Sequence, residues 1–236
     1  MKAILILGLL MGMRHALDAD HLAAVASLST RTRGLRAAIF QGTAWGLGHT
    51  LTLLVVGILC LLLGAAVPSA WAESLELVVG LMLVVLGAQV LLRMYRRRVH
   101  VHVHQHGDGT AHLHAHRHAA EEVHDPSRHE HPHARALPLR ALAVGVVHGL
   151  AGSAALLLLA LSSVSSFWLG LAYILLFGVG SILGMAVLSA VIAVPLQASA
   201  RRLGRLYDGV EALVGLATIT IGAHLVYEIG RRALQG

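Results

Sequence analysis

The stretch GMRHALDADHLAAVASL, residues 12–28, places ionisable side chains in a segment that otherwise begins like a membrane helix. Five of them fall within eight positions: Arg14, His15, Asp18, Asp20 and His21. At about 100° per residue, a continuous helix puts His15, Asp18 and His21 on one arc of about 120°, and Asp20 points away. Two imidazoles and a carboxylate on one face are ligands that suit a borderline divalent cation such as nickel, cobalt, zinc or copper.

These ionisable groups must lie at membrane depth. Residues 3–13 are apolar, but they extend only about 16 Å as a helix, whereas the hydrocarbon core is about 30 Å thick. The span therefore has to continue through the polar cluster to about Leu28. Ionisable groups at that depth cost at least a few kcal/mol each and usually have a function. A purely structural cluster of ion pairs is the alternative interpretation.

Further residues extend the candidate metal site. Asp20 could orient an imidazole, or ligate the metal itself if the helix is broken, and Arg14 could neutralise the carboxylates. We expect His49, mid-span in WGLGHTLTLL, to be a ligand, although a lone intramembrane histidine can instead bond a backbone carbonyl. His148, which matches His15 in the second half of the chain, is either a pathway or a packing residue.

The elements that must position these residues are membrane helices. The 236-residue chain is 56% hydrophobic and 13% charged, with a mean hydropathy of +0.73, which is more apolar sequence than a soluble domain can bury. Hydropathy predicts six spans, at about 3–28, 37–63, 74–95, 139–161, 167–195 and 206–229. The single cysteine excludes an internal disulfide, and the single lysine, Lys2, excludes a nucleotide-binding G-x-x-x-x-G-K-[ST] loop.

Basic residues set the predicted orientation. Of the 18 lysines and arginines, 14 lie in or beside the connections 1–2, 3–4 and 5–6, against Lys2, Arg231 and Arg232 on the other side. The positive-inside rule therefore places these connections in the cytoplasm and both termini outside the plasma (inner) membrane. The same rule explains the net charge of +6 without nucleic acid as a partner.

Residues 96–138 form a low-complexity segment between the spans. It holds 12 of the 17 histidines and has no apolar periodicity, so we expect a disordered cytoplasmic loop. Imidazoles at this density predict loose metal binding at several sites. The loop histidines are His100, His102, His104, His106, His112, His114, His116, His118, His124, His129, His131 and His133.

The two halves of the chain resemble each other. GMRHALDADHLAAVASL aligns with GVVHGLAGSAALLLLAL, WGLGHTL with FGVGSIL, and ELVVGLMLVVLGAQV with EALVGLATITIGAHL, at offsets of 133, 132 and 135 residues. Because each half has three spans, the second half must insert upside down, which is a common plan of secondary transporters. We therefore predict an all-α membrane protein of two inverted three-helix repeats, residues 1–95 and 139–236, joined by the loop 96–138.

The motif H-x-x-x-x-D-H, here His15, Asp20 and His21, resembles the signature of the nickel/cobalt transporter family, and GLGHTLTLL resembles its second histidine motif. The second half is similar to the shorter urease-accessory nickel permeases in GVVHGLAGSAAL and FGVGSILGMAVLSAVI. The family's aspartate-bearing motifs in later helices are absent. The resemblance implies transport of Ni²⁺ or Co²⁺, which are substrates rather than prosthetic groups.

These features together predict a secondary transporter that binds Ni²⁺ or Co²⁺ at His15, Asp18, Asp20, His21 and His49. The intact signature favours uptake, and efflux by a member of the same family is the alternative. Partners would be the lipid bilayer and the metal, with a cytoplasmic metallochaperone or a second copy of the chain as further candidates. A different class is a membrane acyltransferase that uses His15 and Asp20 as a general base and its carboxylate. A structural or accessory subunit is the third class.

Overall fold

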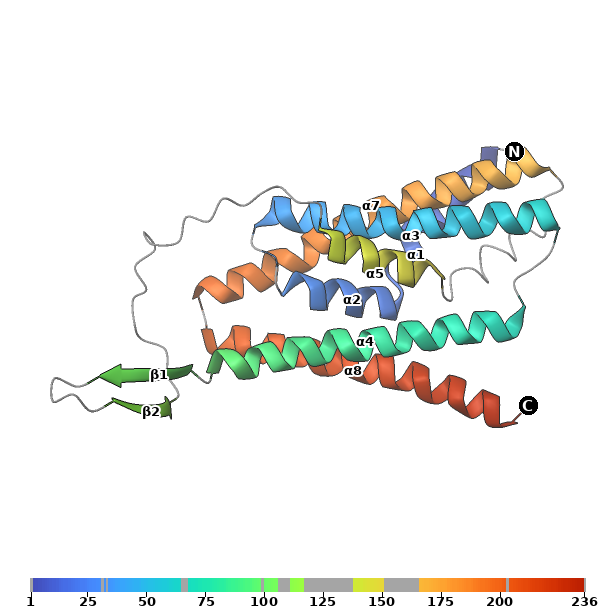
Figure 1. The fold of residues 1–236 in the computed structure, drawn as a ribbon. Coiled ribbons are helices and arrows are strands. Elements are labelled where there is room, and N and C mark those ends of the chain that lie inside the picture. The colour runs from blue at the N-terminus through green and yellow to red at the C-terminus, as the bar shows by residue number, and fades with distance from the viewer. Residues whose placement is uncertain are drawn as a thin grey trace.

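The structure is a computed structural model of the chain. It describes residues 2–30, 32, 34–64, 68–98, 100–105, 111–116, 138–150, 166–202 and 204–235. Within these ranges the chain forms helices and one pair of strands (Figure 1). The elements are α1 (Lys2–His15), α2 (Ala19–Ser29), α3 (Leu35–Leu63), α4 (Ser69–Arg98), β1 (His100–Gln105), β2 (Ala111–His116), α5 (Leu139–Leu150), α7 (Phe167–Arg202) and α8 (Gly204–Gln235).

Four helices, α3, α4, α7 and α8, are long and apolar enough to cross a bilayer, as the hydropathy predicted. Two apolar segments are too short to cross alone: Leu5–His15 of α1, and α5. The first predicted span is wrong as a single helix, because the chain breaks between α1 and α2. Of the predicted span 139–161, only the part up to Leu150 lies within the described residues.

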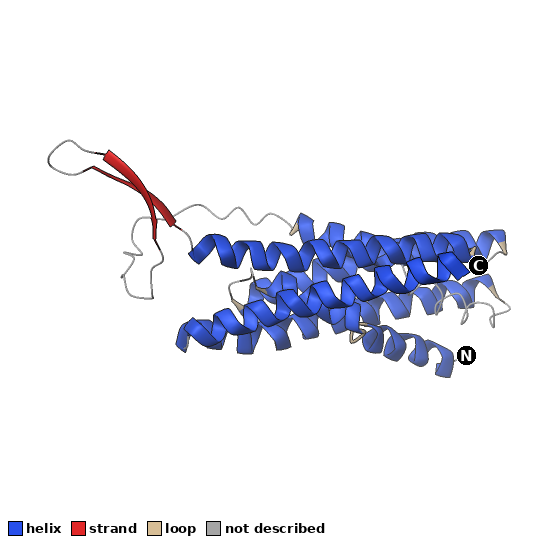
Figure 2. Ribbon diagram, turned by 90° about the horizontal axis from the view of Figure 1, so that it is seen from below, coloured by secondary structure: helices blue, strands red, loops and turns tan. Residues whose placement is uncertain are grey.

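The helices form two groups with α2 between them. In Figure 1, α4 and α8 run side by side on one side, and α1, α3, α5 and α7 lie on the other. The short helix α2 contacts α4, α7 and α8. Both termini lie at one end of the bundle, and the β1–β2 hairpin lies at the opposite end (Figures 1 and 2). This arrangement leaves α2 and the break before it near the middle of the long helices.

Close glycine contacts hold the two short helices against the long ones. A Cβ on Gly12 of α1 would collide with the backbone of Phe177 in α7, and a Cβ on Gly145 of α5 would collide with the backbone of Trp45 in α3. Gly12 and Gly145 are equivalent at offset 133, and Trp45 and Phe177 at offset 132. The contact of α1 in the first half with α7 in the second is therefore matched by the contact of α5 in the second half with α3 in the first.

The contact between α4 and α8 has the same reciprocity. A Cβ on Gly80 would meet the carbonyl oxygen of Gly222 at 3.0 Å, and one on Gly87 would meet that of Gly215 at 2.6 Å. At offset 135, Gly80 corresponds to Gly215 and Gly87 to Gly222, so exchanging the halves converts one contact into the other. Small residues let the backbones approach, which is how membrane helices associate without a hydrophobic driving force between them.

The main buried cluster surrounds α2. It takes residues from α4, α3, α5 and α7 as well as from the break: Ala16, Ala23, Ala24, Val25, Leu28, Ala44, Trp45, Val79, Leu83, Leu86, Ala141, Val144, Met185 and Leu188. Leucines and valines on the outer faces of the long helices, such as Leu51 and Val55 of α3, are exposed. An apolar outer surface over a packed centre is expected of helices that lie in lipid.

Part of the histidine-rich segment differs from the predicted disorder. β1 and β2 pair antiparallel, and the register sets His100 opposite His116, His102 opposite His114 and His104 opposite His112. The alternation of histidine with mostly apolar residues in HVHVHQ and AHLHAH has the period of two that favours strands. The other six loop histidines lie outside the described residues.

Candidate metal centre

The break in the first span creates the candidate centre. α1 ends at His15, and a turn follows in which the Leu17 N–H donates to the Arg14 carbonyl at 2.8 Å and the Asp18 N–H donates to the His15 carbonyl at 3.1 Å. Asp18 then occupies the N-cap of α2 in an extended conformation. Aspartates are favourable at the start of a helix, where the macrodipole is positive, and less favourable within one. The α1 carbonyl end and the α2 amide end therefore meet near the middle of the long helices (Figure 1).

The break also corrects the predicted helical face. In a continuous helix Asp20 would point away from His15, Asp18 and His21, but in the broken chain it contacts His21. The sequence allowed this case, since ligation by Asp20 was expected only if the helix is broken. A helical wheel cannot anticipate the turn at residues 16–18, because it carries one rotation angle through the whole span.

Each carboxylate of the motif orients one imidazole of the motif. The His15 Nδ1–H donates to Asp18 Oδ2 at 2.7 Å, and the His21 Nδ1–H donates to Asp20 Oδ1 at 3.0 Å. The hydrogen bond to His15 replaces the usual helix cap, because the Asp18 side chain bonds none of the α2 amides. These bonds fix the Nδ1–H tautomer of each ring and leave Nε2 as the free ligand atom, the pairing that carboxylates provide for metal-binding histidines.

The free ring nitrogens are buried. Nε2 of His15 and of His21, and both ring nitrogens of His49, have no hydrogen-bond partner among the described residues. The three residues are 7%, 1% and 0% exposed, respectively. Buried polar atoms are normally hydrogen-bonded, so several orphaned nitrogens in one place require an explanation. A metal ion that accepts their lone pairs would provide one.

His49 comes to this group from α3. Its ring centroid lies 5.2 Å from those of His15 and His21, which are themselves 4.4 Å apart. One potential ligand atom from each of the three lies within 4.8 Å of the others. The predicted ligands His15, His21 and His49 are thus brought together, whereas Asp18 and Asp20 lie behind the first two imidazoles.

His148 joins the same cluster from α5. Its Nε2–H donates to Asp20 Oδ2 at 2.9 Å, and its ring lies 4.2 Å from that of His21. Asp20, His21 and His148 form a second group whose potential ligand atoms lie within 4.8 Å of one another. The sequence indicated this residue only through its alignment with His15, and that alignment could not give its contact with Asp20.

Two aromatic rings that the sequence analysis did not select flank the imidazoles. Trp45 lies 5.3 Å from His21 and 5.6 Å from His148, and Phe177 lies 5.6 Å from His15. Both aromatic rings are buried, and they are equivalent across the two halves. Their repeated position was visible in the alignment of WGLGHTL with FGVGSIL, but an aromatic residue in a membrane span is usually packing.

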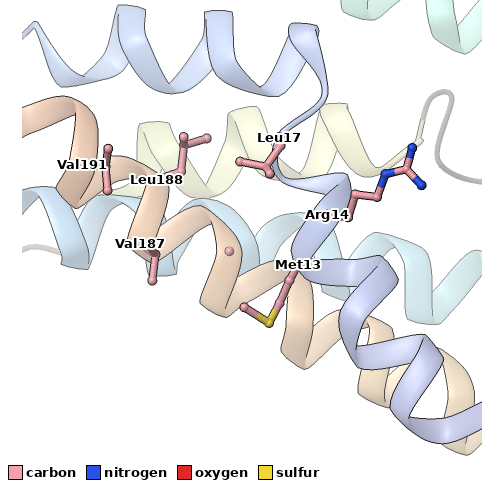
Figure 3. A pocket seen from close by; sticks show the side chains of 7 residues that line it. Met13, Arg14, Leu17, Val187, Leu188 and Val191 are labelled. Carbon is pink, nitrogen blue, oxygen red and sulfur yellow. The ribbon is translucent and has the colours of Figure 1, made fainter. Parts of the chain in front are cut away.

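Arg14 lies outside the cluster. It is exposed and lines a hollow of about 300 Å³ together with Met13, Leu17 and residues of α7. Figure 3 shows its side chain directed away from Val187 and Val191. In the described part of the chain, Arg14 makes no ion pair with Asp18 or Asp20. The carboxylates are balanced instead by hydrogen bonds from imidazoles.

The chemistry of this donor set is that of a site for a borderline divalent cation. Imidazole nitrogens supported by carboxylates suit nickel, cobalt, copper or zinc, and sulfur ligands are not among them. A family model described as a high-affinity nickel-transport protein matches residues 2–203. The chain belongs to the NicO family. This membership confirms the resemblance to nickel transporters and makes the chain a multi-pass membrane protein of a nickel-transport family.

Two curated relatives extend this result. This NicO protein is 34% identical over 229 residues to the urease accessory protein UreH of Bacillus sp. (strain TB-90), which covers 97% of the chain and 92% of the relative. It is 28% identical over 224 residues to the chloroplast protein FOR GROWTH AND FERTILITY 1 of Arabidopsis thaliana, covering 93% of the chain and 57% of that protein. No solved structure matches the chain significantly.

Membership of the NicO family also settles the class of activity. The family transports a metal ion, so the acyltransferase hypothesis is wrong. The geometry agrees, since the carboxylate that bonds His15 is Asp18, whereas that hypothesis required a dyad of His15 and Asp20.

Proposed function

We propose that this protein is a permease that carries Ni²⁺, and also Co²⁺, into the cell through the His/Asp cluster. His15, His21 and His49 hold the ion through one ring nitrogen each, and Asp18 and Asp20 orient the first two rings. The observation that supports it is a group of buried imidazole nitrogens without hydrogen-bond partners among the described residues, contributed by the helices α1, α2 and α3, within 4.8 Å of one another. Neutral nitrogens in a dry site favour a dehydrated transition-metal ion over Mg²⁺ or Ca²⁺, which prefer oxygen ligands.

The transport cycle would use two inverted three-helix repeats, residues 1–95 and 139–236, in a six-span bundle. Reciprocal contacts support this architecture: α1 packs on α7 as α5 packs on α3, and the glycine pairs of α4 and α8 exchange under the same operation. α1 runs toward the centre from the end with the termini, and α5 runs toward it from the hairpin end (Figure 1). Rocking of one repeat against the other would open the centre alternately to each end.

Two further features support inward movement. The predominance of arginine at the hairpin end favours a cytoplasmic position for that end and an external position for both termini of a plasma-membrane protein. An inside-negative potential of 100 mV then favours entry of a divalent ion by about 4.6 kcal/mol. Uptake therefore needs no coupled ion, whereas efflux would need one.

The histidine-rich segment, residues 96–138, would serve the same direction of transport. On the cytoplasmic side its twelve histidines would bind the arriving metal loosely and release it to a metallochaperone. The three cross-strand histidine pairs of β1 and β2 support this role, because they place histidines opposite each other at every second register position.

The decisive experiment is Ni²⁺ entry into sealed vesicles that contain the purified protein, under an imposed inside-negative potential. We expect potential-driven entry by the wild type and its loss in His15→Ala and His49→Ala. His224→Ala is the matched control, because it removes an exposed histidine of α8 that is outside the cluster. Co²⁺ is tested in the same way.

Three results would contradict the proposal. Absence of flux under any potential or pH gradient would reject the permease and leave the accessory-subunit interpretation. Full transport by His15→Ala would reject the cluster as the site. If Ni²⁺ moves only from the cytoplasmic side to the outside, driven by a proton gradient, the protein is an exporter and the proposed direction is wrong.

A further inference from the structure

His21 belongs to both candidate metal groups. With His15 and His49 it forms the group described above, and with Asp20 and His148 it forms another of the same compactness. The centroid of its ring lies 4.4 Å from that of His15, which belongs to the first repeat, and 4.2 Å from that of His148, which belongs to the second. His21 is thus the one ligand that both groups share within the described residues.

The second group has a donor set of its own. The two Asp20 oxygens are divided between two imidazoles, Oδ1 to His21 and Oδ2 to His148. Both histidines are 1% exposed, and the other ring nitrogen of His148, Nδ1, has no partner in the described structure. Two imidazoles and one carboxylate suit the same borderline divalent ions as three imidazoles do. The carboxylate adds a negative charge that a dication in a low-dielectric interior would neutralise.

Each of the two groups includes a histidine from a short helix that starts at a different end of the bundle. His15 is in the last turn of α1, which comes from the end with the termini, and His148 is in the last turn of α5, which comes from the hairpin end. The two residues are equivalent at offset 133. The carbonyl end of a helix carries a partial negative charge that attracts cations. α1 and α5 therefore each place a histidine and a negative helix end at the centre, and they approach it from opposite ends of the bundle.

We propose that Asp20, His21 and His148 form a second transition-metal position, and that the transported ion passes between the two positions while His21 stays bound. The inference rests on the proposed function. In this step the ion exchanges His15 and His49 for Asp20 and His148, so that it moves from a position held by the first repeat alone to one that both repeats hold. A shared ligand makes this physically reasonable, because the ion is never left unligated where dehydration is costly.

Trp45 provides a local readout for occupancy. Its buried ring lies beside both His21 and His148, whereas Trp71 and Trp168 are 70% and 75% exposed. In a Trp71→Phe/Trp168→Phe background, quenching of the Trp45 fluorescence by Ni²⁺ reports metal in the bundle. This signal does not respond to Ni²⁺ bound by the histidine-rich segment. A measurement of total bound Ni²⁺ would include that metal and would therefore obscure binding in the bundle.

The test compares His148→Gln with His148→Ala in this background, measuring Trp45 quenching and Ni²⁺ entry into vesicles. A glutamine amide can still donate to Asp20 Oδ2 but has no ring nitrogen to offer a metal. We expect both variants to retain Ni²⁺ quenching within about threefold of wild type and to lose at least tenfold in flux. His224→Gln should change neither quantity. Unchanged elution in size-exclusion chromatography shows that each variant is folded.

Each contrary result has a distinct meaning. If His148→Gln transports Ni²⁺ at the wild-type rate, His148 only holds Asp20 and the second position is rejected. If His148→Gln loses quenching together with flux, His148 belongs to the same single binding site as His15 and His49, and the proposed passage of the ion between two positions is rejected. Failure of the wild type to transport Ni²⁺ at all would instead reject the proposed function itself.

Discussion

At the scale of single residues, the aspartates and the histidines of the candidate centre have different roles. Asp18 and Asp20 are partly exposed, at 49% and 30% of their side chains, and the imidazoles that they bond are buried. A carboxylate fixes the orientation and tautomer of a ring, and the ring carries the free nitrogen. Selectivity for a transition metal would then come from nitrogen ligands, and the carboxylates would contribute position and charge.

These different roles predict how strongly each substitution of Asp18 lowers the affinity for Ni²⁺. We expect Asp18→Ala to lower the Ni²⁺ affinity about 10–100-fold, as losses of such supporting partners typically do. Asp18→Asn should lower it less, because the amide oxygen still accepts the hydrogen bond from the His15 Nδ1–H. Quenching of Trp45 by Ni²⁺ measures both. Glu228→Gln, which removes a carboxylate paired with Arg231 on α8, is the control. Equal effects of Asn and Ala would show that Asp18 acts through its charge alone.

At the scale of elements, α2 is a short helix in the centre of the bundle, where a few polar contacts add to the apolar packing around it. Ser27 Oγ and Thr218 Oγ1 of α8 are 2.9 Å apart, and both residues are buried. Thr218 also donates within its own helix to the Val214 carbonyl. These hydroxyls connect the C-terminal part of α2 to α8, and the N-terminal part of α2 contributes Asp20 and His21 to the candidate metal centre.

The Ser27–Thr218 contact should be modest in energy but measurable. In a double-mutant cycle with Ser27→Ala and Thr218→Val, we expect a coupling of about 0.6 kcal/mol, and at most about 1.7 kcal/mol, as for other hydrogen bonds between membrane helices. Reversible unfolding in mixed micelles provides the free energies. Thr220→Val is the matched control, because the one hydrogen bond of the Thr220 side chain within the described residues is to the Leu216 carbonyl of its own helix. A coupling of zero would show that α2 is positioned by packing alone.

The contact of α5 with α3 depends on Gly145, and substitution should displace His148. A side chain at this position meets the backbone of Trp45, so Gly145→Ala forces the helices apart. We expect a lower unfolding temperature and at least a tenfold loss of Ni²⁺ flux. Gly209→Ala is the control, since nothing lies within 4 Å of a Cβ there, and alanine favours a helix by up to about 1 kcal/mol. Equal stability of the two variants would mean that the close approach is unimportant.

The sequence predicted most of these elements, for reasons that differ from one to the next. Long apolar runs identify α3, α4, α7 and α8, because length and hydropathy are local properties. The break after His15 depends on a competition that hydropathy does not measure, between helix continuity and the caps and hydrogen bonds that Asp18 and Asp20 make. The strands of the histidine-rich segment were hidden by composition, which indicated disorder although the alternation of residues favoured strands.

At the scale of the whole molecule, the candidate site is a product of the fold rather than of one motif. The signature in α1 and α2 supplies two histidines, but His49 and His148 arrive from α3 and α5. The alignment of the halves indicated that His148 is equivalent to His15. It could not show that His148 contacts Asp20 of the other half, because the contact depends on how α5 packs on α3. The position of His148 in the candidate centre therefore depends on tertiary packing.

The same arrangement gives a prediction for orientation. The termini and the hairpin lie at opposite ends of the bundle, and the arginines concentrated at the hairpin end are expected in the cytoplasm. In a Cys60→Ala background, Leu234→Cys near the C-terminus should react with a membrane-impermeant maleimide in intact cells. Leu139→Cys, at the start of α5, should react only after permeabilisation. Both leucines are exposed, at 90% and 66%, so a difference in labelling reports the side of the membrane and not burial. The opposite pattern would place the hairpin outside, where its histidines would collect metal before transport rather than after it.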